Sequence, residues 1–231
     1  MKLLITSFVI LFGLMSPSFG ETLDDLVYRE GLYFKKFTDT PFTGTIEGKK
    51  QGYLENGKLT GEWTFYHDNG QLLGRGSYHN NLGQGHFVFF YDNGNLELRG
   101  ELIDGKRQGL WEFFREDGTL LSKKYFRDNL LHGISETYFS DGSIISTKEY
   151  ENGKQNGPFT SYYLNGQIED TGNFINGHKH GLWTVFHENG ELWEKGEFIN
   201  GKKNGVWVSY KENGLVDKKH SGTFKNGVKI E

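Results

Sequence analysis

Two series of glycines recur every 24 residues, and this period constrains the fold more than any other feature of the sequence. The first series is Gly61, Gly85, Gly109, Gly133, Gly157, Gly181 and Gly205. The second series is Gly70, Gly94, Gly118, Gly142, Gly166, Gly190 and Gly214. Self-similarity at a fixed period of about 20–50 residues marks a repeat architecture, in which one supersecondary unit is stacked many times. The sequence therefore predicts seven repeats over residues 61–219.

Each repeat has the composition of two short strands joined by tight turns. Triplets such as Asp-Asn-Gly and Glu-Asn-Gly end in a second-series glycine, and a second turn of the type Asn-Gly-Lys completes the unit. Asn, Asp and Gly adopt a left-handed backbone more readily than other residues and therefore favour hairpin turns. Two strands and two turns fill the period and leave no room for a helix. We expect an all-β fold, an elongated single-sheet meander of repeated antiparallel β-hairpins.

Three columns of apolar residues are the expected core. Positions are counted from the first-series glycine of each repeat as zero, so that one repeat places Phe114 at position 5, Leu120 at position 11 and Phe126 at position 17. A three-residue first turn with a glycine bulge would set position 5 opposite position 11. We expect positions 5, 11 and 17 to share one buried face, so that Phe114→Ala costs more stability than Trp111→Ala.

Position 2 is then expected on the opposite face, where six of the seven repeats carry a large ring. This column has two interpretations: packing against a neighbouring hairpin or against long Lys and Glu stems, or contact with a partner. Trp is enriched among the residues that dominate binding energy at interfaces. The partner-binding candidates are Trp63, Phe87, Trp111, Phe159, Trp183 and Trp207.

The regions outside the repeats have different predicted roles. Residues 1–20 have a positive start, an apolar run of 13 residues and small residues before Glu21, which is the pattern of a secretory signal peptide. The apolar run is too short for a membrane-spanning helix. We expect an exported protein that is periplasmic, secreted or held at the cell surface. Residues 21–60 are expected to form a lead-in and capping half-repeat, and residues 220–231 a C-terminal partial repeat.

Composition argues against several classes of function. The 26 basic and 30 acidic residues are well mixed and give a net charge of −4, without the basic stripe that is typical of nucleic-acid binders. The chain has no Cys, which excludes disulfides and thiol chemistry. Its eight His and its Ser residues show no nucleophile–base pattern, and the segment 178–180, "HKH", falls in a turn. We expect no enzymatic activity, no cofactor and no metal site.

The repeat sequences themselves resemble a known family. The stretches "GEWTFYHDNGQL" and "YENGKQNGPFTSYYLNGQI", together with the lead-in "GLYFKKFTDTPFTGTIEG", are similar to MORN-variant repeats, and proteins of this type are grouped as YwqK-like antitoxins. The resemblance covers residues 31–231. It implies a scaffold built as a sheet of hairpins, and a role in neutralising a partner toxin by binding it.

Three hypotheses of function follow. The first is a non-enzymatic, exported repeat scaffold that binds a partner protein, such as a toxin, as an antitoxin or immunity protein does. The second is a cell-surface module for carbohydrate or wall polymer, because aromatic side chains stack on or cage such ligands. The third is a membrane-associated scaffold, although an acidic chain without a polybasic patch is repelled by anionic lipid.

Overall fold

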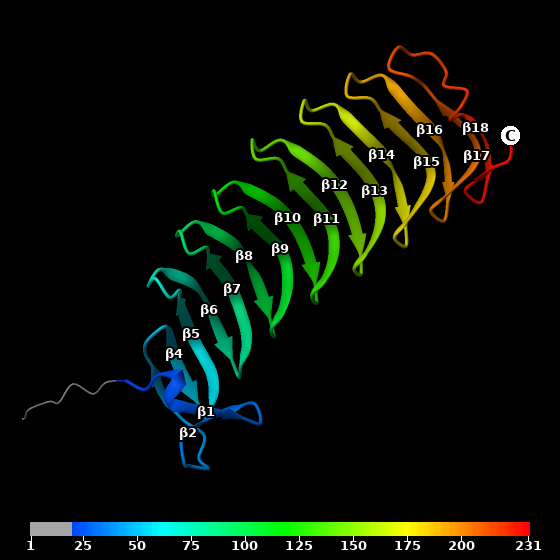
Figure 1. Cartoon of the computed structure of the whole chain (residues 1–231). Coiled ribbons are helices and arrows are strands. Elements are labelled where there is room, and N and C mark those ends of the chain that lie inside the picture. Colours follow the sequence, from blue (N-terminus) through cyan, green and yellow to red (C-terminus); the bar gives the residue numbers. More distant parts are fainter. Residues whose placement is uncertain (1–19) are drawn as a thin grey trace, which may run out of the picture.

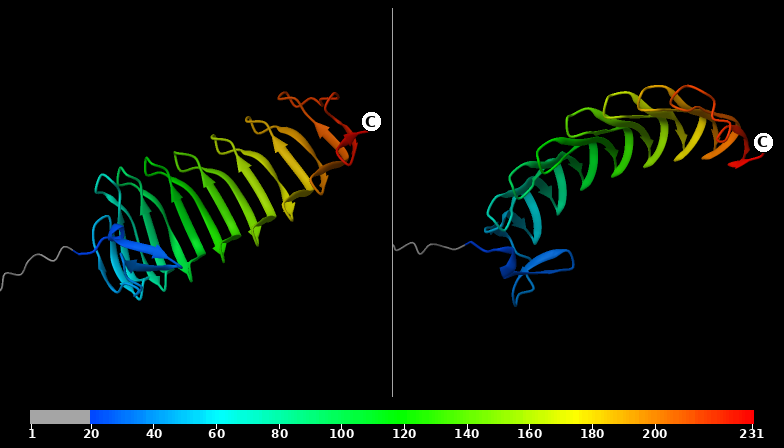
Figure 2. Two further views of the ribbon diagram at one scale, coloured as in Figure 1. Left: turned by 60° about the horizontal axis from the view of Figure 1, so that its bottom comes forward. Right: turned by 45° about the horizontal axis from the view of Figure 1, so that its top comes forward.

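A computed structural model describes residues 20–231 and places most of them in one long antiparallel sheet (Figure 1). Seventeen strands, β3 to β19, each pair with the next strand in sequence. This order is that of a hairpin meander, so the predicted fold class is confirmed. The sheet is elongated and curves along its length (Figure 2). Apart from Gly20, the predicted signal peptide lies outside the described residues.

The strand bounds follow the 24-residue period. They are β1 Leu26–Arg29, β2 Leu32–Lys35, β3 Gly44–Ile46, β4 Lys50–Glu55, β5 Lys58–Tyr66, β6 Leu72–His79, β7 Leu82–Phe90, β8 Leu96–Ile103, β9 Lys106–Phe114, β10 Leu120–Arg127, β11 Leu130–Tyr138, β12 Ile144–Glu151, β13 Lys154–Tyr162, β14 Ile168–Ile175, β15 His178–Phe186, β16 Leu192–Ile199, β17 Lys202–Ser209, β18 Gly222–Lys225 and β19 Val228–Lys229. Each repeat therefore contributes one odd-numbered and one even-numbered strand.

The first turn of each repeat is the three-residue turn that the sequence predicts. In the first repeat the amide of His67 donates to the carbonyl of Gln71 at 2.8 Å, and the amide of Gly70 donates to the carbonyl of His67 at 3.0 Å. Gly70 has a φ of 83°, which only glycine adopts without strain. Tyr66 consequently pairs with Leu72, so the expected opposition of positions 5 and 11 is confirmed.

The second turn is a two-residue hairpin turn with both central residues in the left-handed region. Asn152 has a φ of 49° and Gly153 a φ of 82°, and Glu151 pairs directly with Lys154. Two positive φ values in succession define the type I′ turn, whose twist matches that of the flanking strands. This geometry explains why Asn or Asp precedes the turn's second residue in each repeat.

A bulge after the first turn moves position 17 to the other face. Tyr66 pairs with Leu72, whereas the preceding Phe65 pairs with Gly74, so Leu73 is an extra residue in its strand. One extra residue reverses the side to which all later side chains point. The expectation that positions 5, 11 and 17 share a face is therefore wrong: position 17 lies with position 2.

Position 2, and not position 5, is the most deeply buried column. The exposed fraction is 0% for Trp63, 3% for Trp111 and 0% for Trp183, whereas Phe114 is only half-buried. Rings of positions 2 and 17 contact each other edge-on, as do Phe174 and Trp183 with centroids 5.4 Å apart. The core of this single-layer sheet is therefore a row of rings on one face, interrupted at Leu102 and Ser135.

Glycines at position 15 make room for these rings. The ring of Trp183 covers the backbone of Gly172, and a Cβ added there would come within 2.0 Å of the indole. The same relation holds for Gly52 with Trp63, Gly76 with Phe87, Gly100 with Trp111, and Gly196 with Trp207. Where position 15 is Lys124, position 2 of the next repeat is the small Ser135. Ring and glycine are thus paired across adjacent repeats, except at Lys148, which lies opposite the ring of Phe159.

Side chains of the first turn connect consecutive repeats. The Tyr91 hydroxyl donates to the carbonyl of Phe114 at 2.8 Å, and the Tyr163 hydroxyl donates to the carbonyl of Phe186 at 2.8 Å. The ring nitrogen Nε2 of His67 makes the equivalent hydrogen bond to the carbonyl of Phe90 at 2.8 Å. These bonds satisfy backbone carbonyls at the turn edge, where the strand ladder has ended.

The N-terminal region packs on the first hairpins. A 3₁₀ turn, η1 (Leu23–Asp25), leads into the hairpin of β1 and β2. The amide of Tyr33 donates to the carbonyl of Gly57 at 2.9 Å. A buried cluster then joins the lead-in to the sheet through Leu26, Phe42, Ile46, Leu54 and Trp63.

Candidate binding surface

The sheet has two chemically different faces. The aromatic face carries the side chains of positions 2, 4 and 17, and the polar face carries those of positions 1, 3, 14 and 16. In the second repeat, for example, Phe87 and Phe89 lie on the aromatic face with ring centroids 6.4 Å apart. Arg99 and Glu101 lie on the polar face. A partner that approaches the two faces would meet different groups.

The six predicted partner-contact residues do not form an exposed stripe. Five of them are buried, with exposed fractions of 0–3%: Trp63, Phe87, Trp111, Trp183 and Trp207. The sixth, Phe159, is half-buried and stacks on Trp183 with centroids 5.6 Å apart. Of the two interpretations of this column, the burial agrees with packing, because these rings fill the interior of the aromatic face and present almost no surface to a partner.

Long basic side chains cover the buried rings. The Lys179 ammonium lies 3.9 Å from the centroid of Trp183, and the Lys203 ammonium lies 4.1 Å from the centroid of Trp207. A cation over an aromatic ring is attracted by its negative face. Lys203 also contacts the Glu194 carboxylate at 2.5 Å. The rings of the aromatic face are thus covered by lysine side chains of the same face, which gives these cations a structural role.

Asp170 is a partly buried acid of this covering layer. Burial raises the pKa of its carboxyl above the ordinary value, and the Lys179 ammonium, 3.6 Å from Oδ2, acts in the opposite direction. Its buried Oδ1 has no hydrogen-bond partner among residues 20–231. Desolvation of the carboxylate therefore makes its ion pair with Lys179 weak as a source of stability.

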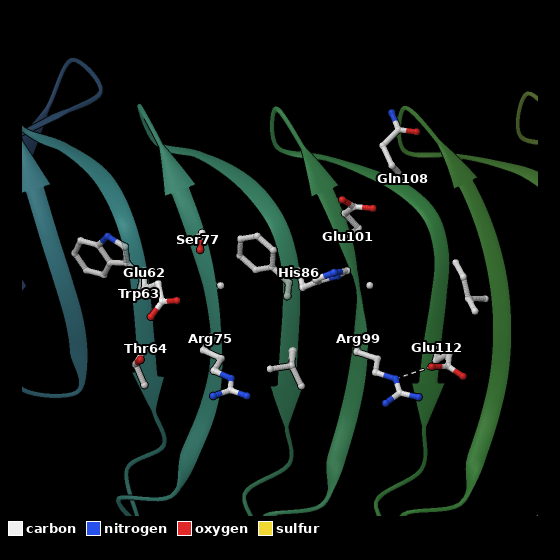
Figure 3. A pocket seen from close by; sticks show the side chains of 15 residues that line it. Glu62, Trp63, Thr64, Arg75, Ser77, His86, Arg99, Glu101, Gln108 and Glu112 are labelled. Carbon is white, nitrogen blue, oxygen red and sulfur yellow. Dashed lines mark hydrogen bonds and ion pairs between the residues drawn. The ribbon is translucent and has the colours of Figure 1, made fainter.

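A groove of about 900 Å³ crosses the polar face over β5 to β9 (Figure 3). It is lined by side chains of positions 1, 3, 14 and 16 from neighbouring hairpins. The charged and titratable residues that line it are Glu62, Arg75, His86, Arg99, Glu101 and Glu112. We call it the polar-face groove.

Only part of the charge in the polar-face groove is internally paired. The Arg99 Nε lies 2.5 Å from the Glu112 Oε2, and Figure 3 shows this pair joining β8 to β9. Arg75, the residue equivalent to Arg99 one repeat earlier, is exposed and forms no ion pair within residues 20–231. A guanidinium without a partner presents several donors in a fixed plane. The groove can therefore bind polar and charged groups of a macromolecule.

The groove residues were not identified from the sequence. Position 14 is Arg75, Arg99 and Lys123 in the first three repeats and changes to Thr147 and Thr171 later, so no single residue type marks the column. A local run of basic residues at one repeat position was the signal that could have found it. The fixed aromatic column was chosen instead, and that column serves packing.

The histidines and acids do not assemble into a metal centre in the described part of the chain. Within residues 20–231, no three or more His, Asp or Glu side chains lie together in a way that could hold a metal ion. His187 hydrogen-bonds the carbonyl of Tyr210 at 3.0 Å, which matches the role of His67 in the first repeat. Over the same residues, no helix has the length and apolar character that a membrane span requires.

Comparison with known proteins identifies the repeat. Five segments match the family described as "MORN repeat variant": residues 59–80, 107–128, 131–152, 155–176 and 179–200. Each segment spans two consecutive strands joined by the first turn, as β9 and β10 are. Five of the repeats therefore match the MORN repeat variant, and MORN repeats are scaffold units that commonly mediate protein or membrane interactions. The description names a repeat and no catalytic activity.

Other comparisons add little. No curated protein matches the chain. Among solved structures it is similar to one titled "Crystal Structure of TarM", with 15% identity and a TM-score of 0.25. The match covers 58% of this chain and 21% of that chain, so this chain spans about a fifth of that protein's length.

Proposed function

Because its hairpins are MORN-variant repeats, we propose that this protein is an exported, non-enzymatic scaffold that binds a partner protein through its polar face. The observation that carries the proposal is the polar-face groove, with carboxylates at Glu62 and Glu101 and a guanidinium at Arg75 that forms no ion pair within residues 20–231. Repeat scaffolds of this kind present variable side chains on a constant frame, and extended surfaces are their usual mode of recognition.

Export and the antitoxin role belong to the same proposal. The signal-peptide pattern of residues 1–20 supports export. The resemblance to YwqK-like antitoxins suggests that the partner is a toxin. An exported antitoxin is an immunity protein, and its toxin would act outside the cytoplasm. Fractionation of cells that express the tagged full chain tests export, with processing after Gly20 expected.

A protein partner is favoured over the carbohydrate alternative. Sugar binding by this repeat would rely on exposed rings that stack on the ligand. The Trp column is buried, with Trp63 and Trp183 at 0% exposure, so it offers no stacking platform. The groove instead combines both signs of charge with apolar Val88 and Leu110, as protein-binding surfaces do.

The proposal is tested by co-purification of a partner from envelope extracts. Wild-type protein is expected to recover a stoichiometric protein, and Arg75→Glu is expected to reduce the recovery at least tenfold. Lys218→Glu is the matched control, because Lys218 is exposed, changes the charge equally and lies far along the chain from the groove. Absence of any stoichiometric partner, or equal loss in both variants, would count against the proposal.

A further inference from the structure

Position 1 of the polar face changes character along the sheet. It is charged or polar in the first two repeats, with Glu62 and His86, and apolar from the third repeat onward. The exposed fraction is 54% for Ile134, 64% for Leu182 and 67% for Val206. We call the apolar set the aliphatic row; its members are Leu110, Ile134, Pro158, Leu182 and Val206. Exposed apolar residues that line up on one face indicate an interaction surface more often than isolated exposed apolar residues do.

The aliphatic row continues the polar-face groove. Leu110 lines the groove beside Arg99 and Glu112. From there the row extends over β11, β13, β15 and β17, with one member on each alternate strand. A single partner segment that lies across the strands would therefore contact both the groove and the row.

Carboxylates flank the aliphatic row on one side. Ile134 is directly opposite Glu149, and Leu182 is directly opposite Glu197. Glu101, Glu149 and Glu197 all occupy position 16, and none forms an ion pair within residues 20–231. Basic side chains, Lys123 and Lys195, lie in the adjoining row at position 14. An occupant with basic groups on the carboxylate side would complement this arrangement.

We propose that the aliphatic row binds an extended segment of a protein partner that has an apolar side chain at every third position and Lys or Arg between them. Neighbouring strands are about 4.8 Å apart, so equivalent positions of successive repeats are separated by about 9.6 Å. A polyproline-II segment advances about 9.3 Å in three residues and returns every third side chain to the same side.

An α-helix fits the same row less well. Side chains seven residues apart on a helix are separated by about 10.5 Å along its axis. From Leu110 to Val206 the row spans four repeats. Over this span the difference in length between the row and the bound segment grows to about 4 Å for the helix and to about 1 Å for the extended segment. The spacing of the row therefore selects the extended form.

This inference rests on the proposed function, since it names the kind of segment that the partner supplies. The probe is a fluorescein-labelled peptide of five Leu-Pro-Lys triplets, and its binding to the full chain is measured by fluorescence anisotropy. A control peptide has the same composition with its leucines grouped together. We expect the periodic peptide to bind at least tenfold more tightly than the control peptide.

Variants locate the binding to the row. Two double variants are each expected to weaken binding of the periodic peptide at least tenfold. The first combines Ile134→Ser with Leu182→Ser, and the second combines Glu149→Lys with Glu197→Lys. Leu164→Ser is the control, because Leu164 is 60% exposed but lies in a first turn. Circular dichroism verifies that each variant retains its sheet. Equal binding of the two peptides, or wild-type binding by the Ile134/Leu182 variant, overturns the inference.

The outcomes separate this inference from the proposed function. If the envelope partner is recovered equally by wild type and by the Ile134/Leu182 variant, the scaffold function stands and the assignment of the row fails. If no partner is recovered but the periodic peptide binds selectively, the proposed function fails and the row remains a peptide site. If wild type is a dimer that the Ile134/Leu182 variant converts to a monomer, the row is occupied by a second copy and the inference is overturned.

Discussion

The indole of Trp183 lies directly over the backbone of Gly172, one strand away in the preceding repeat, so closely that a Cβ at Gly172 would come within 2.0 Å of it. This contact recurs along the sheet and gives a single-layer fold its core. Gly172→Ala is expected to destabilise the protein by about 1–3 kcal/mol, the usual cost of overpacking. Urea denaturation monitored by circular dichroism measures the change.

A double substitution tests whether the cost arises from this contact. In Trp183→Ala the ring is gone, so adding Gly172→Ala should cause little further loss. The two residues should therefore show a coupling free energy of about 1 kcal/mol or more, in the range found for contacting pairs. Additive effects would mean that the backbone of Gly172, and not the ring above it, requires glycine.

Truncation of an aromatic residue should cost more stability at position 2 than at position 5, because position 2 is more deeply buried. Trp111→Ala should cost about 3–5 kcal/mol, as truncation of buried large rings does. Phe114→Ala should cost clearly less, because Phe114 is only half-buried whereas Trp111 is 3% exposed. This order reverses the one expected from the sequence. The thermal or urea unfolding midpoints of the two variants decide between the two orders. A larger loss of stability for Phe114→Ala would contradict the face assignment.

The hydrogen bonds between turns should contribute modestly to the coupling between repeats. Tyr163→Phe removes the donor to the carbonyl of Phe186 and should cost about 1 kcal/mol. Tyr53→Phe serves as the control, since Tyr53 is 43% exposed. Amide exchange provides a second readout, with faster exchange expected at the first turns on both sides of the lost bond. Equal stability of the two variants would argue against a role for this ladder.

Tyr138 makes the free energy of unfolding depend on pH in the alkaline range. Burial and the hydrogen bond from its hydroxyl to the Glu136 carboxylate, at 2.6 Å, raise the pKa of Tyr138 to about 12. The unfolded chain has an ordinary tyrosine pKa of about 10, so the folded state retains this proton longer. The contribution is present below about pH 10 and is lost as the pH rises from about 10 to about 12.

Tyr138→Phe isolates that contribution. The free energy of unfolding of the variant should fall less steeply between about pH 10 and pH 12 than that of wild type, when both are measured by denaturant titration. The other tyrosines titrate in both proteins, so the comparison cancels them. Identical slopes would show that the proton of Tyr138 is not linked to folding.

The sequence predicted the hairpins, their period and the first turn, because glycine and asparagine at fixed spacing leave few alternatives. It did not predict which positions share a face of the sheet. The register of the first turn was correct, with Tyr66 opposite Leu72, but the extra residue Leu73 reversed the strand beyond it. A bulge of this kind follows from hydrogen-bond geometry and leaves no distinct residue type in the sequence.

The candidate surface was harder to predict than the fold. Residues that pack recur in most repeats, whereas residues that face solvent are free to vary, so the sequence pointed to the aromatic column at position 2 and not to Arg75 and Leu182. The pairing of the glycine at position 15 with the ring at position 2 of the following repeat could not be predicted without the strand register.

Side-chain footprinting of the full chain by hydroxyl radicals, with and without its captured partner, measures directly whether the partner binds on the polar face. Binding along the aliphatic row predicts protection of Ile134, Leu182 and Leu110 on the polar face, and no change at Leu164, which lies in a first turn. Protection of Leu164 and Leu215 at the turns, with Ile134 and Leu182 as reactive as in the free protein, would contradict it.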